Sequence, residues 1–334
     1  MSNGDCDLAG VVAIGASAGG VEALTQLAEG LSADLPYAFL VTLHLSPAAP
    51  SVLASIVGRR GPLPAVAAEH GTEVKPAHIY LAIPDHHLLV GDHRVVLSRG
   101  PTENGHRPAI NALFRSAALV FGPRAIGVLL SGVLDDGVQG LETIRARGGV
   151  TIGQTPDDAL FPAMPTNAAA AGILDYQVSA AGVGPLLKEL ARREITSRGA
   201  APDETLELEN RIAMAPQFAT EFDTERLGPA SGYTCPDCNG SLTALGHNNF
   251  RCRVGHAWSP ESLLTARDDE FEAALWVALR SLREKAGLAR KLADRTGHGL
   301  MAERYRHNAE EAERSLAVLS ERLGLSGRPH DADG

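Results

Sequence analysis

One serine stands in a run of small residues directly after an apolar segment. Residues 11–14 are all apolar, and the segment 15–20 reads Gly-Ala-Ser-Ala-Gly-Gly, with the serine at position 17. The pattern G-x-S-x-G is typical of a sharp strand-to-helix turn that exposes a serine oxygen for nucleophilic attack. Two other interpretations stay open on these residues alone: a glycine turn that admits a dinucleotide pyrophosphate, and a turn whose serine has no chemical role.

The dinucleotide interpretation is the weaker of the two chemical ones. The glycine spacing departs from G-x-G-x-x-G, and the next apolar segment ends in His44, where a dinucleotide site would place an acidic residue for the ribose. His44 is instead a residue that could activate Ser17. Taken alone, it could equally be a hydrogen-bonded residue at the end of a strand.

Two aspartates follow another apolar segment, at positions 135 and 136. If the segments before Ser17, His44 and these aspartates are parallel strands of one sheet, their carboxyl ends meet at one edge. A serine, a base and a carboxylate that orients the base are the parts that nucleophilic ester hydrolysis needs. A helix cap or a turn residue is the alternative reading of Asp136.

A second cluster of reactive side chains lies late in the chain. Cys235 and Cys238 form a C-x2-C pair, and Cys252 and His256 form a C-x3-H pair after a spacer of thirteen residues. Four such ligands complete a tetrahedral zinc site and leave no open position, so the spacing predicts a structural zinc ion. A metal-free or redox use of the C-x2-C pair is the alternative. Cys6 stands alone, and the cysteines do not form a secreted disulfide framework.

The elements that must position the first cluster alternate between strand-like and helix-like segments from residue 11 to about 193. This alternation predicts an α/β fold: a doubly wound, mostly parallel sheet in a three-layer αβα arrangement. A β-hairpin insertion is expected within 79–97, where turn residues separate short apolar runs. The strand-like segments are 11–15, 38–43, 65–68, 79–83, 125–130 and 149–153, and the helix-like ones are 21–30, 50–59, 110–121 and 138–147.

Five motifs in this order carry a family resemblance that covers residues 11–190. Together they resemble the catalytic domain of the chemotaxis receptor glutamate methylesterase, the CheB type. The motifs are Ile14-Gly15-Ala16-Ser17-Ala18-Gly19-Gly20, Thr42-Leu43-His44, His106-Arg107-Pro108, Leu130-Ser131-Gly132-Val133-Leu134-Asp135-Asp136-Gly137 and Met164-Pro165.

The resemblance implies a serine esterase that hydrolyses glutamate γ-methyl esters on chemoreceptor-like proteins through an acyl-enzyme. Ser17 would be the nucleophile, His44 the general base and Asp136 the residue that orients the imidazole. The same mechanism can release ammonia from a glutamine side chain, and no cofactor is implied for catalysis. Backbone amides at the start of the helix after Ser17, with one from the loop 132–133, would meet the developing negative charge.

Three positions depart from the family pattern or compete with it. Asp135 is the rival of Asp136, although the pattern aligns Asp136 with the catalytic carboxylate and Asp135 with a position that is often asparagine. Ala18 stands where a hydroxyl residue is frequent, and Val133 where methionine is common. These two differences bear on substrate fit more than on catalysis.

Other histidines and one arginine have weaker claims to the site. His87 and His106 are candidates to line a substrate groove, while the surface or a turn is expected for His70, His78, His86 and His93. Arg107 could hold a substrate carboxylate, but an ordinary salt bridge is the default expectation.

The C-terminal part is expected to add a zinc ribbon and an antiparallel helical hairpin. Apolar residues at helical spacing recur in two stripes on either side of Gly297-His298-Gly299, namely Phe271, Leu275, Ala278, Leu282, Ala286 and Ala289, and Tyr305, Ala309, Ala312, Leu316, Leu319 and Leu323. The expected organisation is an N-terminal tail 1–10, the catalytic domain 11–193, a linker 194–230 with a short helix at 204–212, the ribbon 231–258, the hairpin 259–325 and a disordered tail 326–334.

Composition narrows the setting. The chain has 334 residues, 44% of them hydrophobic, and a formal net charge of −10. No apolar run approaches a membrane span, residues 1–8 lack a signal pattern, and we expect a cytoplasmic protein. The negative charge argues against nucleic-acid binding, since that needs a concentrated basic surface.

Chemotaxis methylesterases usually carry an N-terminal receiver domain, but here the catalytic strand begins at residue 11. We therefore expect no phosphorylation in cis. The expected partners are a methylated helical receptor and, in trans, a methyltransferase or response regulator of the phosphorelay. An adapter of the same fold that binds a receptor helix but no longer hydrolyses anything is the alternative function.

Overall fold

The computed structural model describes residues 8–47, 52–195, 203–215, 228–245 and 249–324. The chain divides into two compact units, 1–263 and 264–334. Cys6, most of the expected N-terminal tail, the C-terminal tail and much of the expected linker lie outside the described residues. Within the described part, no helix is both long enough and apolar enough to cross a membrane.

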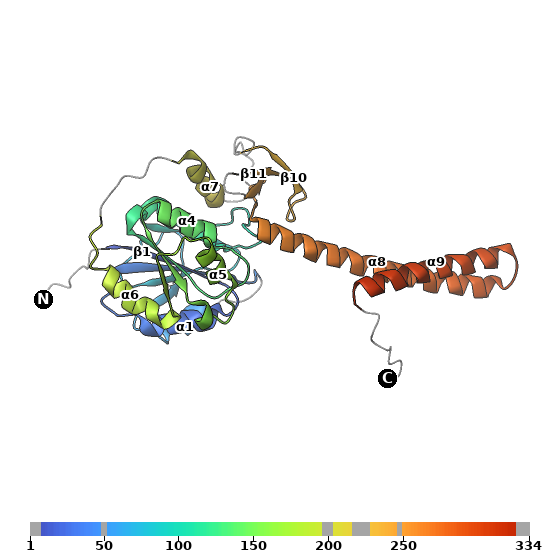
Figure 1. The fold of residues 1–334 in the computed structure, drawn as a ribbon, viewed down its shortest axis with the longest axis horizontal. Helices are drawn as coiled ribbons and strands as arrows, with labels where there is room; N and C mark the ends of the chain where they lie inside the picture. Colours follow the sequence, from blue (N-terminus) through green and yellow to red (C-terminus); the bar gives the residue numbers. More distant parts are fainter. Residues whose placement is uncertain (1–7, 48–51, 196–202, 216–227, 246–248, 325–334) are drawn as a thin grey trace. The chain divides into compact units, whose positions relative to one another are not determined.

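A parallel sheet of seven strands forms the centre of the first unit (Figure 1), in the order β3-β4-β2-β1-β7-β8-β9. The chain places β2, β3 and β4 on one side of β1 and then returns to add β7 on the other side, so the strand order reverses between β1 and β7. The predicted doubly wound sheet is confirmed. The strands are β1 (Gly10–Ala16), β2 (Tyr37–Leu43), β3 (Ala65–Ala67), β4 (Ile79–Leu81), β7 (Ala125–Leu129), β8 (Val150–Gln154) and β9 (Tyr176–Val178).

Helices cover both faces of this sheet because its strands are apolar on both sides. Along β1, Val12 and Ile14 pack on one face and Val11 and Ala13 on the other. The first face is covered by α1 (Gly20–Gly30), α2 (Leu53–Gly58) and α6 (Val183–Leu190). The second is covered by α3 (Ile110–Phe121), α4 (Val138–Ala146) and α5 (Ala163–Ala170). Short 3₁₀ turns lie at Gly122–Arg124, Pro156–Asp158 and Ala180–Gly182.

The hairpin insertion is present as β5 (His87–Gly91) and β6 (Arg94–Ser98). Asp92 and His93 form its turn with positive φ angles, as a two-residue hairpin turn requires. β4 belongs to the main sheet, as its place among the strand-like segments predicts, and only β5 and β6 form the hairpin. The short edge strand β9 and the helices α5 and α6 are not among the predicted elements.

The segment expected as a linker contains a packed helix, α7 (Glu204–Met214). Asp203 caps its start by accepting a hydrogen bond from the amide of Leu206, at 3.0 Å. Its end is buried at Ile212 and Ala213, and the carbonyl of Ala213 accepts the hydroxyl of Ser98 from β6 at 2.7 Å. The carboxyl end of α7 is therefore fixed on the α/β core.

The predicted ribbon is a four-stranded antiparallel sheet, and it belongs to the first compact unit. Its strands are β10 (Ala230–Thr234), β11 (Ser241–Ala244), β12 (Phe250–Cys252) and β13 (Ala257–Trp258). From the sequence the ribbon is expected as a domain of its own, whereas the structure groups it with the α/β core as far as residue 263.

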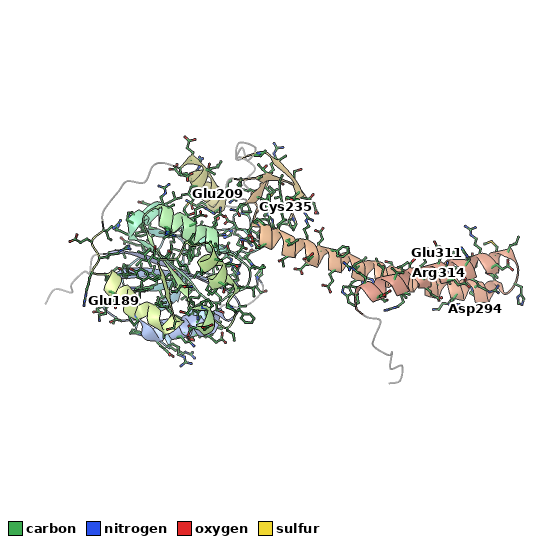
Figure 2. All side chains as sticks on the ribbon, in the orientation of Figure 1. Glu189, Glu209, Cys235, Asp294, Glu311 and Arg314 are labelled. Atoms are coloured by element: carbon green, nitrogen blue, oxygen red, sulfur yellow. The ribbon has the colours of Figure 1, made fainter. Side chains whose placement is uncertain are left out.

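The second unit is built from the long helix α8 (Pro260–Thr296), from residue 264 onward, and from α9 (Leu300–Arg322), which runs back along it. Most of the buried residues of the two helices are alanines, and charged side chains such as those of Asp294, Glu311 and Arg314 are exposed (Figure 2). Phe271 from the predicted stripe is 54% exposed and lies outside this seam. The buried residues are Leu279, Ala286, Ala289, Ala293, Ala302, Ala309 and Ala312.

Candidate active site

Ser17 directly follows β1 and lies in a turn that a second serine holds in place. The amide of Ser17 donates to the carbonyl of Ser131 at 2.9 Å, and the hydroxyl of Ser131 donates to the carbonyl of Ala18 at 2.8 Å. Gly19 has a φ of 70°, and a side chain there would lie 2.7 Å from the Ser131 hydroxyl and 2.8 Å from Leu160. The small residues of the motif are therefore required by this close packing.

His44 reaches Ser17 because β2 pairs with β1 along its whole length and both strands end at the same edge. The Ser17 hydroxyl donates to Nδ1 of His44 over 3.1 Å, and Nε2 of His44 donates to Oδ2 of Asp136 over 2.8 Å. An ionised acceptor at Nε2 fixes the ring proton there and leaves Nδ1 free to accept the serine proton. The structure thus joins the three residues in one chain of hydrogen bonds.

Asp136 is 2% exposed and lies at the amino end of α3. Its carboxylate accepts the amide of Ile110 at 2.7 Å and that of Asn111 at 3.3 Å. Burial opposes ionisation, but the hydrogen bond and charge of His44 and the amide of Ile110 outweigh it, and the pKa of Asp136 lies below its usual value. Asp136 is therefore a buried carboxylate that stays charged at neutral pH.

Asp135 points elsewhere and has different partners. Its Oδ1 accepts the hydroxyl of Ser259 at 2.8 Å and the hydroxyl of Ser262 at 3.0 Å. Burial raises the pKa of Asp135 to about 6 against the effect of these two hydrogen bonds, and the charges of Glu261 and Asp136 raise it further. The geometry places Asp136, and not Asp135, on His44.

His106 lies at the site, and His87 does not. The His106 ring stacks on His44 with 3.7 Å between ring centroids and 19° between the planes. Burial, followed by the neighbouring His44, lowers the pKa of His106 to about 4, so that its ring is neutral. His87 is fully buried, with its ring nitrogens on the carbonyl of Pro101 and the amide of Ala109. The interpretation of His87 as a groove residue is wrong.

A cleft of about 330 Å³ opens beside His44 and His106, and Arg107 and Asp85 form part of its wall. Arg107 binds Asp85 and donates to the carbonyl of Gly100 at 2.9 Å. The default expectation of a salt bridge for Arg107 is confirmed. At the wall of the cleft, the positive charge of the Arg107 guanidinium is therefore already paired with the carboxylate of Asp85.

Two backbone amides near Ser17 already donate to carbonyl oxygens and therefore cannot stabilise an oxyanion. The amide of Ser17 is taken by Ser131, and that of Gly132 donates to the carbonyl of Phe161 at 2.9 Å. The amide expected from the loop 132–133 is therefore not that of Gly132. The amides of Ala18, Gly19 and Val133 donate to no acceptor within the described ranges.

Ser131 is the site residue that sequence reasoning missed. It is fully buried, and besides its two contacts with the Ser17 turn it accepts the amide of Phe161 at 2.9 Å. Its own amide donates to the side chain of Gln154 at 2.8 Å. Its place two residues after the end of β7, at the same sheet edge as Ser17, is the signal that could have identified it.

The four predicted metal ligands come together in the ribbon. Their ligand atoms all lie within 4.8 Å of one another. Sγ of Cys252 lies 3.6 Å from Sγ of Cys238 and 3.5 Å from Nδ1 of His256, and Sγ of Cys235 lies 3.7 Å from the same nitrogen. Zinc–sulfur bonds of about 2.3 Å and zinc–nitrogen bonds of about 2.1 Å set tetrahedral ligands about 3.5–3.8 Å apart. The residues fit zinc.

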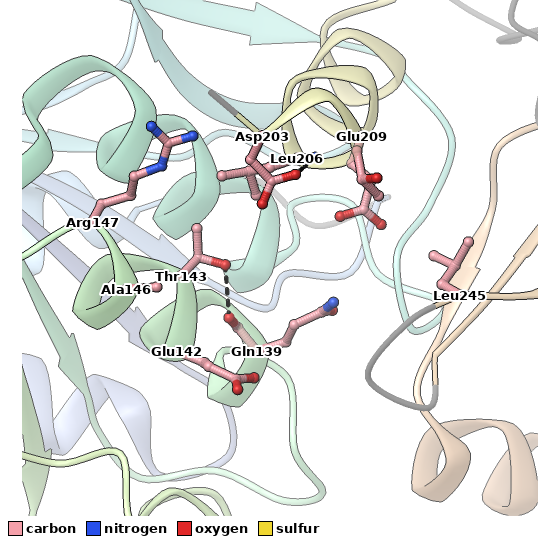
Figure 3. Close-up of a pocket in the computed structure, with 10 residues that line it drawn as sticks. Gln139, Glu142, Thr143, Ala146, Arg147, Asp203, Leu206, Glu209 and Leu245 are labelled. Atoms are coloured by element: carbon pink, nitrogen blue, oxygen red, sulfur yellow. Dashed lines mark hydrogen bonds between the residues drawn. The ribbon is translucent and has the colours of Figure 1, made fainter. Parts of the chain in front are cut away.

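A second cavity, of about 320 Å³, lies between α4 and α7 (Figure 3). Gln139 and Thr143 of α4 face Leu206 and Glu209 of α7 across it, and the Thr143 hydroxyl donates to the Gln139 carbonyl within α4 at 3.0 Å. Ser17, His44 and Asp136 do not line this cavity.

The chain is similar to a group of curated proteins over its α/β region. It is 38% identical over 157 residues to protein-glutamate methylesterase/protein-glutamine glutaminase 4 of Myxococcus xanthus, covering 47% of this chain and 44% of that one. It is 36% identical over 186 residues to protein-glutamate methylesterase/protein-glutamine glutaminase 3 of Anaeromyxobacter dehalogenans, covering 55% and 54%. The chain thus spans about half the length of the curated relatives it matches.

The fold is similar to a solved structure over the same region. The crystal structure of the Thermotoga maritima CheB methylesterase catalytic domain superposes with a TM-score of 0.52 at 29% identity, over 54% of this chain and 98% of that one. Residues 12–187 also match the model of the CheB methylesterase family. More than half of the chain, including Ser17, His44 and Asp136, lies within that match, and the chain belongs to the CheB methylesterase family.

Proposed function

We propose that the protein is a serine esterase that hydrolyses γ-methyl esters of glutamate in a protein substrate. The observation that carries this proposal is the chain of hydrogen bonds from Ser17 through His44 to Asp136, at 3.1 and 2.8 Å, at the carboxyl edge of the sheet. Family membership and relatives with that activity in their names support the substrate class.

In the proposed reaction the oxygen of Ser17 attacks the ester carbonyl carbon while Nδ1 of His44 takes the hydroxyl proton. Asp136 stabilises the imidazolium, and the tetrahedral intermediate collapses as His44 returns the proton to the methoxide, which leaves as methanol. Water, deprotonated by His44, then cleaves the acyl-enzyme to a glutamate carboxylate and free Ser17. A glutamine side chain would follow the same steps and release ammonia.

The amides of Ala18, Gly19 and Val133 are our candidates for stabilising the oxyanion. They lie on the two loops that flank Ser17, and among the described residues they have no other acceptor. The loop that contains Val133 lies close to Ser17, because a side chain on the neighbouring Gly132 would lie 2.9 Å from Cβ of Ser17.

The substrate we propose is a methylated receptor helix. Val133, Leu160 and Phe161 are 45%, 66% and 40% exposed, and Leu160 and Phe161 pack beside Gly19 in the turn of the nucleophile. Exposed apolar side chains around a reactive serine suit the apolar face of a helix better than a small free ester. A methyltransferase or a response regulator in trans would be a further partner.

The ribbon ligands would hold a structural zinc ion, because four protein ligands leave no position for substrate. Reduced thiols that serve as ligands fit a reducing compartment, and we therefore propose the cytoplasm as the location.

The test is methanol release from methyl-esterified receptor preparations by the wild type and by Ser17→Ala. A fluorophosphonate that forms a covalent adduct with an activated serine gives a second readout by intact mass. We expect methanol release and a single adduct for the wild type and neither for the variant. Equal release by both proteins would overturn the serine mechanism, and the absence of both signals from the wild type would favour a binding adapter.

A further inference from the structure

A tight turn formed by residues 103–106 touches two members of the Ser17–His44–Asp136 chain. Glu103 and His106 exchange backbone hydrogen bonds of 2.9 and 3.2 Å, and Asn104 and Gly105 between them have φ angles of 53° and 73°. This Asn-Gly pair suits a two-residue turn with both central residues at positive φ. We call residues 103–106 the Asn104 turn.

Both ends of the Asn104 turn face the site. The side-chain amide of Asn104 donates to Oδ1 of Asp136 over 3.4 Å, the carboxylate oxygen that His44 does not bind. At the other end His106 stacks on the ring of His44. Asn104 is 8% exposed, so these contacts are almost fully shielded from solvent. The turn thus supports the carboxylate and the imidazole at once.

The ribbon holds the turn from the opposite side. The amide of Asn104 donates to the carbonyl of Ala257 in β13 at 2.8 Å, and the amide of Ser259 donates to Oδ1 of Asn104 at 2.8 Å. Gly105 packs against the indole of Trp258, since a side chain on this glycine would lie 3.4 Å from that ring. A parallel β-bridge between Glu103 and Ala257 therefore connects β13 to the Asn104 turn.

The start of α8, directly after the ribbon, also binds the loop that carries Asp136. The hydroxyls of Ser259 and Ser262 bind Asp135, the residue next to Asp136. Ser259 thus contacts both Asn104 and Asp135, and through them it approaches Asp136 from two directions.

Buried charges fix the base of the turn. Glu103 binds Arg115 of α3 and lies 3.5 Å from Arg251 of β12. Arg251 also binds Glu209 of α7 at 3.2 Å, and all four side chains are at most 9% exposed. Such a network tolerates little displacement, because any broken pair leaves a buried charge without a partner.

The position of β13 depends on the predicted metal. Its two residues directly follow His256, and β12 ends at Cys252. Strands of two and three residues are too short to hold their own pairing, so ligand bonds on both sides of this hairpin would supply the rigidity.

We infer that Asn104 is a positioning residue for Asp136 and His44, and that the zinc ribbon is a part of the active site because β13 and Ser259 hold Asn104 in place. The inference rests on the proposed esterase function. It gives the ribbon a role in catalysis that requires no contact with substrate.

Without the Asn104 amide, Asp136 keeps the amides of Ile110 and Asn111 but loses the contact on the side of the ribbon. The carboxylate can then rotate, and the imidazole is aligned for proton transfer in a smaller fraction of molecules. Misplacement of a catalytic group lowers the rate of the chemical step rather than substrate binding. We expect Asn104→Ala to lower the second-order rate of fluorophosphonate addition to Ser17 about ten-fold, with kcat for methanol release reduced and KM unchanged.

A zinc-ligand variant tests the link to the ribbon. Cys238→Ser in the full chain should lower zinc content and slow fluorophosphonate addition to a similar degree as Asn104→Ala. The double variant should be no slower than the slower single variant, since both changes remove one support. Ser231→Ala is the matched control. It removes a 2.7 Å hydrogen bond to the Leu242 carbonyl between β10 and β11, which do not pair with the Asn104 turn. This variant should react like the wild type.

Asn104→Asp separates positioning from a general loss of stability, and it serves if Cys238→Ser does not fold. This variant keeps an oxygen for the Ser259 amide but places a second negative charge beside Asp136. The pH at which fluorophosphonate addition is half maximal should therefore rise, because an added carboxylate favours the imidazolium form of His44. A residue with a purely structural role would lower the thermal midpoint of Asn104→Ala and leave kcat of the folded protein unchanged.

The outcomes distinguish the two proposals. If the wild type shows neither adduct nor methanol release, the proposed function fails. If the wild type reacts but folded Asn104→Ala and Asn104→Asp match its rate and its pH profile, the inference about Asn104 is overturned and the proposed function stands.

Discussion

Asp135 and Asp136 are neighbours with the same side chain, and the structure gives them opposite surroundings. Asp136 receives two backbone amides and His44, and its pKa is lowered. Asp135 receives two hydroxyls and faces other acids, and its pKa is raised. Sequence analysis could place both at the sheet edge, but the choice between them depends on which way each side chain turns.

Replacing each aspartate by asparagine should separate their roles. Asp136→Asn should lower kcat by about 10³–10⁴-fold, because an amide at this position no longer fixes the His44 tautomer or stabilises the imidazolium. Asp135→Asn keeps an oxygen acceptor for Ser259 and Ser262 and should retain most of the activity. Methanol release at saturating substrate measures both. A larger loss for Asp135→Asn would show that the roles are reversed.

The raised pKa of Asp135 predicts how stability changes with pH. A carboxyl with a usual pKa of 3.8 and a folded-state pKa of about 6 binds its proton more tightly in the folded protein. Its ionisation therefore lowers the free energy of unfolding as pH rises from about 4 to 6, by about 2 kcal/mol, and the loss persists above that pH. Asp135→Asn should be more stable relative to wild type at pH 7.5 than at pH 4.5, as measured by urea unfolding.

The control for this pH dependence is Asp157→Asn, which removes a charge from an exposed position. Its stability relative to wild type should be nearly the same at the two pH values. A stability difference for Asp135→Asn that is likewise independent of pH would contradict the prediction.

Among the elements, those that depend on local sequence were predicted and those that depend on docking were not. The strands and helices of the α/β core follow from apolar segments and turn residues, and the ends of β1, β2 and β7 brought Ser17, His44 and Asp136 to one edge. The docking of α7 and the contact of Ser259 with Asn104 join segments up to 155 residues apart, and no periodicity records such pairs. The Asn-Gly dipeptide at 104–105 was a visible turn signal that sequence analysis did not use.

Arg251 of the ribbon binds Glu209 of α7 and lies beside Glu103, which also binds Arg115 of α3. Arg251→Met should lower the free energy of unfolding of this unit by about 3–5 kcal/mol, because Glu209 loses its buried partner. Urea unfolding followed by the fluorescence of buried Trp258 measures the change.

Arg60→Met is the comparison for Arg251→Met, since the ion pair of Arg60 with Glu29 lies on the surface with both side chains at least half exposed. Exposed pairs contribute little to stability. The unfolding midpoint of Arg60→Met should match that of the wild type, and equal midpoints for both variants would contradict the role of Arg251.

At the scale of the whole molecule, the family match and the first compact unit end at different residues. The family match ends at residue 187, whereas the first compact unit extends to 263. The additional residues include α7 and the ribbon, which pack on the α/β core rather than follow it as a separate part. Spacing alone predicted the ribbon ligands, but the surface on which the ribbon docks could be found only in three dimensions.

Metal analysis tests this organisation in the full chain. The purified protein should contain one zinc ion per chain, and a strong chelator should shift the fluorescence of buried Trp258 to longer wavelength as the ribbon loosens. Cys252→Ser should lose the metal, whereas Cys6→Ser, which lies outside the ligand motif in sequence, should keep it. A metal-free protein with a native Trp258 spectrum would contradict the prediction.

The bridge between β13 and the Asn104 turn also bears on how such a protein can evolve. A domain joined only by a tether can be exchanged, duplicated or deleted with little effect on the enzyme beside it. Here the removal of residues 204–262 would uncover the buried charges of Glu103 and Arg115 and the carboxylate of Asp135. Loss of the ribbon by a gene rearrangement would therefore have to be accompanied by changes in the catalytic core itself, so the two parts are expected to be inherited together.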